Sequence, residues 1–118
     1  MLIVDDSPDA RNMLKLHLET VGNQVVVAPD GRTAIDTARK HRPRAVLLDL
    51  TLPDMSGHEV ARQLRQLDET RESLLIAVSG HGSAEDRRKS QEAGFDHHLQ
   101  KPVDLDDLEK LLSQAPAS

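Results

Sequence analysis

The sequence predicts an α/β fold, a single doubly wound sheet of five parallel strands in the order 2-1-3-4-5 with helices on both faces. Two observations predict this class. Short, wholly apolar runs alternate along the chain with segments of helical period, and unbroken apolar runs are typical of parallel strands that helices cover on both sides. Strand–helix repeats joined by right-handed crossovers pack most naturally as an open sheet between two layers of helices.

The first repeat consists of an apolar strand at 2–4 and a helix. Ser7 can cap this helix with its hydroxyl, Pro8 suits the first helical position, and Gly22 stops the helix. Apolar residues at helical spacing share one face, which we expect to point inward: Leu14, Leu18 and Val21.

The second repeat begins with a strand at 24–28, where three consecutive valines favour an extended backbone. Asp30 can cap the following helix. Pro43 prevents that helix from continuing, because proline lacks the backbone N–H group that a helix interior needs. The residues expected on its inner face are Ala34, Ile35 and Ala38.

The third repeat carries a charge at the end of a buried strand. Apolar residues at 45–48 lead directly into Asp49, and the loop 50–55 follows. The segment Ser56–Glu59 matches a capping box, in which serine and glutamate satisfy free N–H groups at a helix start. The residues expected on the inner face of this helix are Val60, Ala61, Leu64 and Leu67.

The fourth repeat contains the helix with the weakest packing signal. Its strand spans 74–78 and ends at Ser79. Ser83 can cap the next helix and Gly94 can end it. Residues 84–93 carry almost no apolar stripe, however, so we expect this helix to be weakly held.

The fifth repeat closes the domain. A short strand at 97–100 precedes Lys101, and a helix capped by Asp104 follows. Its inner face is expected to consist of Leu105, Leu108, Leu111 and Leu112. We therefore assign residues 1–113 to one domain and residues 114–118 to a C-terminal tail or the start of a linker.

Composition excludes several classes of function. The chain has 118 residues, no cysteine, and 20 acidic against 15 basic side chains, a net charge of −5. This charge repels nucleic-acid backbones, so direct nucleic-acid binding is not expected. No apolar stretch approaches the ~18 residues of a membrane span, and we expect a cytoplasmic protein that is monomeric or weakly dimeric. The single aromatic residue, Phe95, is expected in the core, which leaves no rings to stack on a cofactor.

Polar residues follow four of the predicted strands at their carboxyl ends. Asp5 and Asp6 follow the first strand, Asp49 the third, Ser79 the fourth and Lys101 the fifth. In open parallel sheets, ligands bind at these ends near the point where the strand order reverses, which here lies between strands 1 and 3. We expect one pocket there, with three carboxylates, a hydroxyl and a lysine.

Taken in chain order, these residues resemble the receiver domain of two-component response regulators, from Leu2 to Leu112. Any one matching position is a weak signal, but all of them at the right strand ends are specific: Asp5, Asp6, Asp49, Pro53, Gly57, Ser79, Gly80, Lys101 and Pro102. The resemblance implies a flavodoxin-like fold and a cis peptide before Pro102. It also implies that Asp49 accepts phosphate from the phosphohistidine of a histidine kinase or a phosphotransfer protein.

A divalent cation suits the three carboxylates, because neighbouring negative charges repel one another. Mg²⁺ prefers hard oxygen ligands and retains several waters. A site made of Asp6, Asp49, the backbone carbonyl of Thr51 and waters therefore fits it, with Asp5 acting largely through water. Mn²⁺ is the alternative ion. Taken alone, Asp6 also suits the start of the following helix, where an acid interacts well with the helix dipole.

Phosphoryl oxygens would be held by Lys101, Ser79 and a backbone amide near Gly80. Ser79 stands where threonine is commonest in the family, and His98 stands where many receivers carry an aromatic residue, so the resemblance assigns these two positions to the switch. Movement of Ser79 toward phosphate would draw in the weakly held helix that follows it. We expect the downstream partner to bind at 84–112.

His98 and the segment Lys101–Leu105 look most like those of receivers attached to hybrid histidine kinases, so a hybrid kinase is one candidate for the parent chain. The isolated domain is not expected to be an enzyme beyond its own phosphorylation and dephosphorylation.

Other functions share part of the pattern. One alternative is a receiver that docks proteins without phosphorylation. Such receivers have lost residues of the site, whereas this chain retains every required group. A haloacid-dehalogenase-type phosphatase uses an aspartate where this chain has Thr51, and a flavodoxin needs aromatic walls. A transition-metal site is not expected, because His97 and His98 point to opposite sides of a strand.

Overall fold

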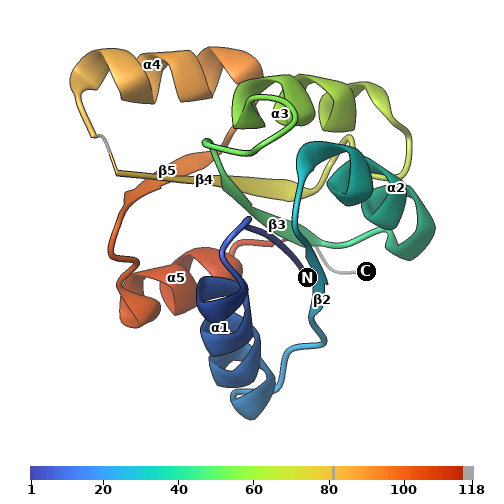
Figure 1. Ribbon diagram of the computed structural model, residues 1–118, viewed down its shortest axis with the longest axis vertical. Helices are drawn as coiled ribbons and strands as arrows, with labels where there is room; N and C mark the ends of the chain where they lie inside the picture. The colour runs from blue at the N-terminus through green and yellow to red at the C-terminus, as the bar shows by residue number, and fades with distance from the viewer. Residues whose placement is uncertain (81, 116–118) are drawn as a thin grey trace.

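The computed structural model describes residues 1–80 and 82–115, and within them it contains a five-stranded parallel sheet in the order β2-β1-β3-β4-β5 (Figure 1). The predicted fold class and strand order are confirmed. The strands are β1 (Leu2–Val4), β2 (Val26–Ala28), β3 (Ala45–Asp49), β4 (Leu74–Ser79) and β5 (His97–Gln100). The helices are α1 (Pro8–Thr20), α2 (Gly31–His41), α3 (Gly57–Gln66), α4 (Ala84–Ala93) and α5 (Leu105–Leu112).

Helices cover both faces of the sheet (Figure 1). Helices α1 and α5 pack on one face, and α2, α3 and the end of α4 pack on the other. Each strand contributes alternate side chains to the two layers, as the two-residue period of a strand requires. In β1, for example, Leu2 and Val4 belong to the cluster under α2 and α3, whereas Ile3 belongs to the cluster under α1 and α5.

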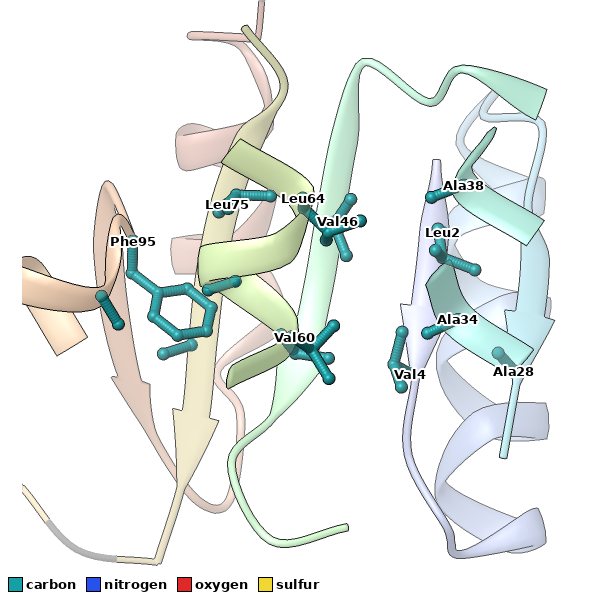
Figure 2. Close-up of a cluster of buried hydrophobic side chains, with 14 residues drawn as sticks. Leu2, Val4, Ala28, Ala34, Ala38, Val46, Val60, Leu64, Leu75 and Phe95 are labelled. Carbon is teal, nitrogen blue, oxygen red and sulfur yellow. The ribbon is translucent and has the colours of Figure 1, made fainter. Parts of the chain in front are cut away.

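The larger of the two apolar clusters lies between the sheet and helices α2 and α3. Figure 2 shows Leu64 of α3 close to Val46 of β3, Val60 one helical turn away from Leu64, and Ala34 of α2 beside Val4 of β1. These side chains are 0–1% exposed, and burying a side chain the size of valine or leucine stabilises a fold by about 1.5–3 kcal/mol. Two further predicted inner residues, Ile35 and Leu67, are partly buried against the same cluster.

The second cluster is completed by α5. Leu108 is fully buried there, and the other predicted inner residues of this helix are partly buried against it: Leu105, Leu111 and Leu112.

Every predicted capping residue caps its helix. Backbone N–H groups of the first turns donate to the side chains of Ser7, Asp30, Ser56, Ser83 and Asp104. At Ser56 the first half of the capping box is formed, since Glu59 N donates to Ser56 Oγ at 3.2 Å. The Glu59 carboxylate accepts from Gln63 and Arg62 instead, because residues three and four positions apart share one face of a helix.

The prediction for Val21 is wrong. Helix α1 ends at Thr20, and Val21, the residue that caps it, is 50% exposed. The chain leaves helical geometry before Gly22, whose φ is +99°, so the side chain at position 21 no longer follows the helical period. Leu14 and Leu18 are buried as expected.

Strand β2 is shorter than the predicted 24–28. It begins at Val26, which pairs with Leu2, the first residue of β1. Because β1 is only three residues long, the residues before Val26 have no strand residue beside them. Val25 is buried all the same, in the cluster under α1 and α5.

Helix α4 buries little, as its composition predicted. Of its ten residues, only Ser90 and Ala93 are buried. Gly94 ends the helix in the left-handed conformation, with φ +107°. Phe95 follows in the core, 4% exposed, with its ring edge-on to that of His58 at a centroid distance of 6.3 Å.

Three further features bear on the expectations from sequence. No helix in residues 1–80 and 82–115 has the length and apolar character needed to cross a membrane. The Lys101–Pro102 peptide is cis, as the resemblance implied. Of the predicted tail, 116–118 lies outside the described residues, as does His81 in the loop that follows β4.

Candidate functional site

The pairing of the strands brings the predicted polar residues together at the edge of the sheet formed by the carboxyl ends of the strands. We call this edge, with Asp5, Asp6, Asp49, Ser79 and Lys101, the rim. In the parallel register Val4 lies opposite Leu48, so the residues that follow them, Asp5 and Asp49, are neighbours at the carboxyl ends of β1 and β3. Ser79 ends β4 opposite Gln100 of β5, and Lys101 follows at once, with its N–H donating to the Ser79 carbonyl at 2.8 Å. The rim therefore lies where the strand order reverses.

Three carboxylates form the acidic part of this rim. One oxygen from each of Asp5, Asp6 and Asp49 lies within 4.8 Å of the other two. Asp49 is 3% exposed, Asp5 is 6% exposed, and Asp6 faces solvent. Burial raises the pKa of Asp5, and the charges of Asp49 and Asp6 raise it further, against the lowering effect of the Ser7 amide and of Lys101.

The chemistry of these donors fits a hard divalent cation. All three side chains offer carboxylate oxygens, which are the ligands that Mg²⁺ prefers in proteins. Their mutual repulsion would be relieved by a positive charge between them. The three carboxylates therefore fit a magnesium ion in their chemistry.

Lys101 supplies the positive charge of the rim. Its Nζ donates to Asp49 Oδ2 at 2.7 Å, and its side chain is 42% exposed. Partial burial lowers the pKa of Lys101, but the hydrogen bond to Asp49 and the charges of Asp49, Asp5 and Asp6 outweigh it, so the pKa lies above its usual value. The lysine therefore stays charged against a carboxylate that is almost fully buried.

The second oxygen of Asp49 is bound by the backbone. Thr51 N donates to Asp49 Oδ1 at 2.9 Å, so both carboxylate oxygens have a partner. Thr51 was expected to contribute its carbonyl, and the contact that the structure contains is made by its N–H group. The loop behind Asp49 also depends on Gly57, because a Cβ there would come 2.7 Å from Leu50 Cα.

Sequence reasoning missed one neighbour of the acidic cluster. Arg11 of α1 donates from Nη1 to the backbone carbonyl of Asp5 at 2.7 Å, while Ser7 N donates to Asp5 Oδ1 at 2.9 Å. These contacts hold the start of α1 against the end of β1. No motif marks Arg11, and the only signal in the sequence is its spacing of six residues from Asp5.

The two predicted switch residues are in direct contact. Ser79, 5% exposed, has its Oγ 2.9 Å from Nε2 of His98. Nδ1 of His98 lies 3.0 Å from Oγ of Ser90, a residue of α4 that is 1% exposed. Ser90 was not singled out in the sequence, because a serine within a polar helix carries no signal of its own.

A cleft of about 540 Å³ opens beside the acidic cluster. Its polar wall includes Asp5, Asp49 and Lys101, and its apolar wall includes Met13 of α1 and Val103 after β5. Met13 is 63% exposed. The cleft makes the rim accessible from the side of α1.

Comparison with known proteins gives a consistent result. A family model described as "Response regulator receiver domain" matches residues 1–113. The chain is 36% identical over 108 residues to the response regulator MprA of Mycolicibacterium vanbaalenii, covering 92% of this chain and 46% of MprA. It is 34% identical over 113 residues to the sensor histidine kinase RcsC of Salmonella typhi, covering 96% of this chain and 12% of RcsC. The chain thus spans less than half the length of these two relatives.

Solved structures share the fold over almost the whole chain. The chemotaxis protein CheY4 of Vibrio cholerae matches with a TM-score of 0.91 at 29% identity, covering 98% of this chain and 96% of CheY4. The receiver domain of sensor histidine kinase PA1611 from Pseudomonas aeruginosa matches with a TM-score of 0.87 at 28% identity, covering 97% and 93%. That second structure has a magnesium ion coordinated in its active-site cleft.

Proposed function

The chain belongs to the family of response regulator receiver domains, and from this premise we propose that Asp49 is the residue that accepts the phosphoryl group. The domain is a phosphoacceptor of two-component signal transduction, which is the function of its family. One observation carries the assignment to Asp49. It is a nearly buried carboxylate in a cluster of acids, and it has a lysine on one oxygen and a backbone N–H group on the other.

In the proposed reaction, a carboxylate oxygen of Asp49 attacks the phosphorus of a phosphohistidine in line with the P–N bond. The new O–P bond forms as the P–N bond breaks, and the electron pair of that bond returns to the imidazole ring. Contacts with Thr51 N and Lys101 Nζ orient the attacking carboxylate. The product is an aspartyl phosphate.

Three groups are proposed to hold the transferred phosphoryl oxygens. Lys101 contributes a point charge, Ser79 a hydroxyl and Gly80 a backbone N–H group. Lys101 and Ser79 come from neighbouring strand ends of the same rim, which supports a shared role. These groups act by binding and orientation, which is the main contribution of a protein to phosphoryl transfer.

Asp5, Asp6, Asp49 and the backbone carbonyl of Thr51 would hold Mg²⁺, with Mn²⁺ as the alternative ion. When bound, the ion supplies positive charge that offsets the negative charge of the carboxylates and the phosphoryl group. The magnesium ion in the cleft of the PA1611 receiver supports this proposal.

Receiver domains act with histidine kinases or phosphotransfer proteins, and such a protein is the proposed phosphate donor here. The similarity to RcsC supports a hybrid histidine kinase as the parent chain. We propose that residues 1–113 form the receiver unit and that, by itself, this unit catalyses only its own phosphorylation and dephosphorylation.

The proposed output surface is the segment 84–112, formed by α4, β5 and α5. Between these elements lies a groove of about 640 Å³ lined by Arg87, Arg88, Asp107 and Lys110, among others. The groove gives a downstream protein both charged and apolar contacts. Its connection to the rim through Ser79 and His98 supports a response to phosphorylation.

Intact-mass spectrometry tests the assignment of Asp49. The chain has no tryptophan, so a mass measurement is preferable to fluorescence. Incubation with acetyl phosphate and Mg²⁺ is expected to add one phosphoryl group to the wild type and none to Asp49→Asn. Absence of the added mass in the wild type, or its presence in both proteins, overturns the assignment.

A further inference from the structure

Three side chains outside the acidic cluster form a hydrogen-bonded chain that leads from the rim to α4. Ser79 Oγ lies 2.9 Å from His98 Nε2, and His98 Nδ1 lies 3.0 Å from Ser90 Oγ. Both serines are buried, at 5% and 1% exposed, and the histidine between them is partly buried. One imidazole ring thus joins a hydroxyl at the end of β4 to the last part of α4.

The rules of hydrogen bonding allow this chain only two directions when His98 is neutral. A neutral imidazole has one N–H donor and one acceptor nitrogen, and a hydroxyl has a single proton to donate. If Nε2 is the acceptor, Ser79 gives its proton to His98, and Nδ1–H donates to Ser90. If Nε2 carries the proton, it donates to Ser79, and Ser90 must donate to Nδ1.

Only the second direction leaves the Ser79 proton for a phosphoryl group on Asp49. Phosphoryl oxygens are negatively charged acceptors, so a hydroxyl binds them by donating. We propose that Ser90 is a positioning residue for the phosphorylation of Asp49. By donating to Nδ1, it holds His98 as the Nε2–H tautomer, and that N–H group directs the proton of Ser79 toward the phosphoryl oxygens. This inference rests on the proposed function of Asp49.

The competing arrangement is a serine that acts only within its own helix. A helical serine can donate to the backbone carbonyl four residues earlier, which for Ser90 is that of Asp86. Ser90 would then accept from Nδ1–H, and Ser79 would donate to His98. The two arrangements differ in the tautomer of His98, which can be measured.

Nitrogen NMR on protein labelled with ¹⁵N-histidine distinguishes them. The sample is the wild type with Mg²⁺ and beryllofluoride, an analogue of the phosphoryl group. The expected result for His98 is a protonated Nε2 and an unprotonated Nδ1. The hydrogen bond that one ring nitrogen accepts leaves the proton on the other nitrogen. An Nδ1–H tautomer, or protons on both nitrogens, overturns the role of Ser90.

The kinetic test uses Ser90→Ala, with Ser113→Ala as the matched control. Alanine fits the space of serine and suits a helix interior, so the fold is retained. Removing a hydrogen-bond donor to the developing oxyanion typically lowers a reaction rate about 10²–10³-fold. Misdirecting the Ser79 proton is a smaller change, and we expect it to lower the rate of phosphorylation about fivefold. With acetyl phosphate as donor, the maximal rate should fall and the KM should stay unchanged in Ser90→Ala. The control Ser113→Ala makes the same change at an exposed position outside 84–112 and should match the wild type.

The outcomes separate the two proposals. A wild type that gains no phosphate at all overturns the role of Asp49. A wild type that gains phosphate no faster than Ser90→Ala, with the His98 tautomer unchanged between the two proteins, overturns the role of Ser90 alone.

Discussion

Asp5 is a residue of the site that destabilises the folded protein at neutral pH. Its carboxyl group is buried, and burial followed by the charges of Asp49 and Asp6 raises its pKa above 3.8. An acid with a higher pKa in the folded state binds protons more tightly when folded. Its contribution to stability is therefore fully present below pH 3.8 and is lost as the pH rises through the folded-state pKa. At neutral pH the ionised Asp5 destabilises the protein.

Asp5→Asn should therefore stabilise the protein at pH 7 in the absence of divalent cations, by an amount on the order of 1 kcal/mol. Asparagine keeps the oxygen that accepts from Ser7 N. Urea denaturation with a chelator present measures the effect, and the gain should shrink as the pH approaches 3.8.

Two controls accompany this variant. Asp68→Asn changes an exposed acid, with a side chain 88% exposed, and should stay within about 0.5 kcal/mol of the wild type. Excess Mg²⁺ should remove or reverse the advantage of Asp5→Asn, because a ligand stabilises most the protein that binds it most tightly. A chelator-treated Asp5→Asn less stable than the wild type contradicts the argument.

At the scale of elements, Arg65 of α3 joins parts of the molecule that apolar packing leaves weakly connected. Its guanidinium donates to the carbonyls of Arg71, Ser73 and Gly94 at 2.6–2.9 Å. It also pairs with Asp96 at 2.8 Å, and Asp96 accepts from Leu75 N. One side chain therefore fastens the connection into β4, the end of α4 and the approach to β5.

Replacing Arg65 by methionine should destabilise the fold by about 2–4 kcal/mol, because the two partly buried carbonyls of Ser73 and Gly94 lose their donor while the apolar stem is kept. Arg62→Met is the matched control. Its ion pair with Glu59 is long, at 3.4 Å, and exposed, so its loss should cost under about 0.5 kcal/mol. Equal unfolding midpoints in urea for Arg65→Met and the wild type would show that α4 is held by other contacts.

The elements themselves could be predicted because their signals are local. A serine or aspartate before an apolar run determines where a helix starts, and all five predicted caps are confirmed. The contacts of Arg65 could not be predicted, because its partners come from three other segments. The prediction that Val21 lies on the inner face of α1 was wrong for a related reason, because the hydrophobic period does not show where the helix ends.

At the scale of the whole molecule, the rim could be predicted because right-handed crossovers leave few strand orders, and four of the five strands are followed by a polar residue. What could not be predicted is which polar groups from distant parts of the sequence come into contact. The Asp54 carboxylate, for example, accepts from the Gly31 and Arg32 N–H groups at the start of α2. The contact between Ser90 of α4 and His98 of β5 is a second example. Such contacts depend on the packed positions of helices.

The arrangement of the layers predicts where a response to phosphorylation appears. Ser79 connects the rim to His98 and Ser90, and so to α4, the helix with the least apolar burial. Hydrogen exchange measured by mass spectrometry, with and without beryllofluoride and Mg²⁺, should show amides of α4 and β5 exchanging several-fold more slowly in the loaded protein.

Helix α2 is the internal control for this measurement. It lies in the same layer but far along the sheet from β5 (Figure 1), so its exchange should be unchanged. Equal slowing in α2 and α4 would point to general stabilisation by the bound ion, and no slowing in α4 would contradict the proposed output surface.

The two adjacent histidines of β5 give the protein its own pair of spectroscopic reporters. His98 contacts Ser79 and Ser90 in the layer of α4, whereas His97 Nε2 lies 3.0 Å from Gln114 Oε1, just beyond α5. Because successive side chains of a strand point to opposite faces, the ring signals of these two residues report on the two layers separately. In a chain without tryptophan, both sides of the sheet can be followed at once without introducing any probe.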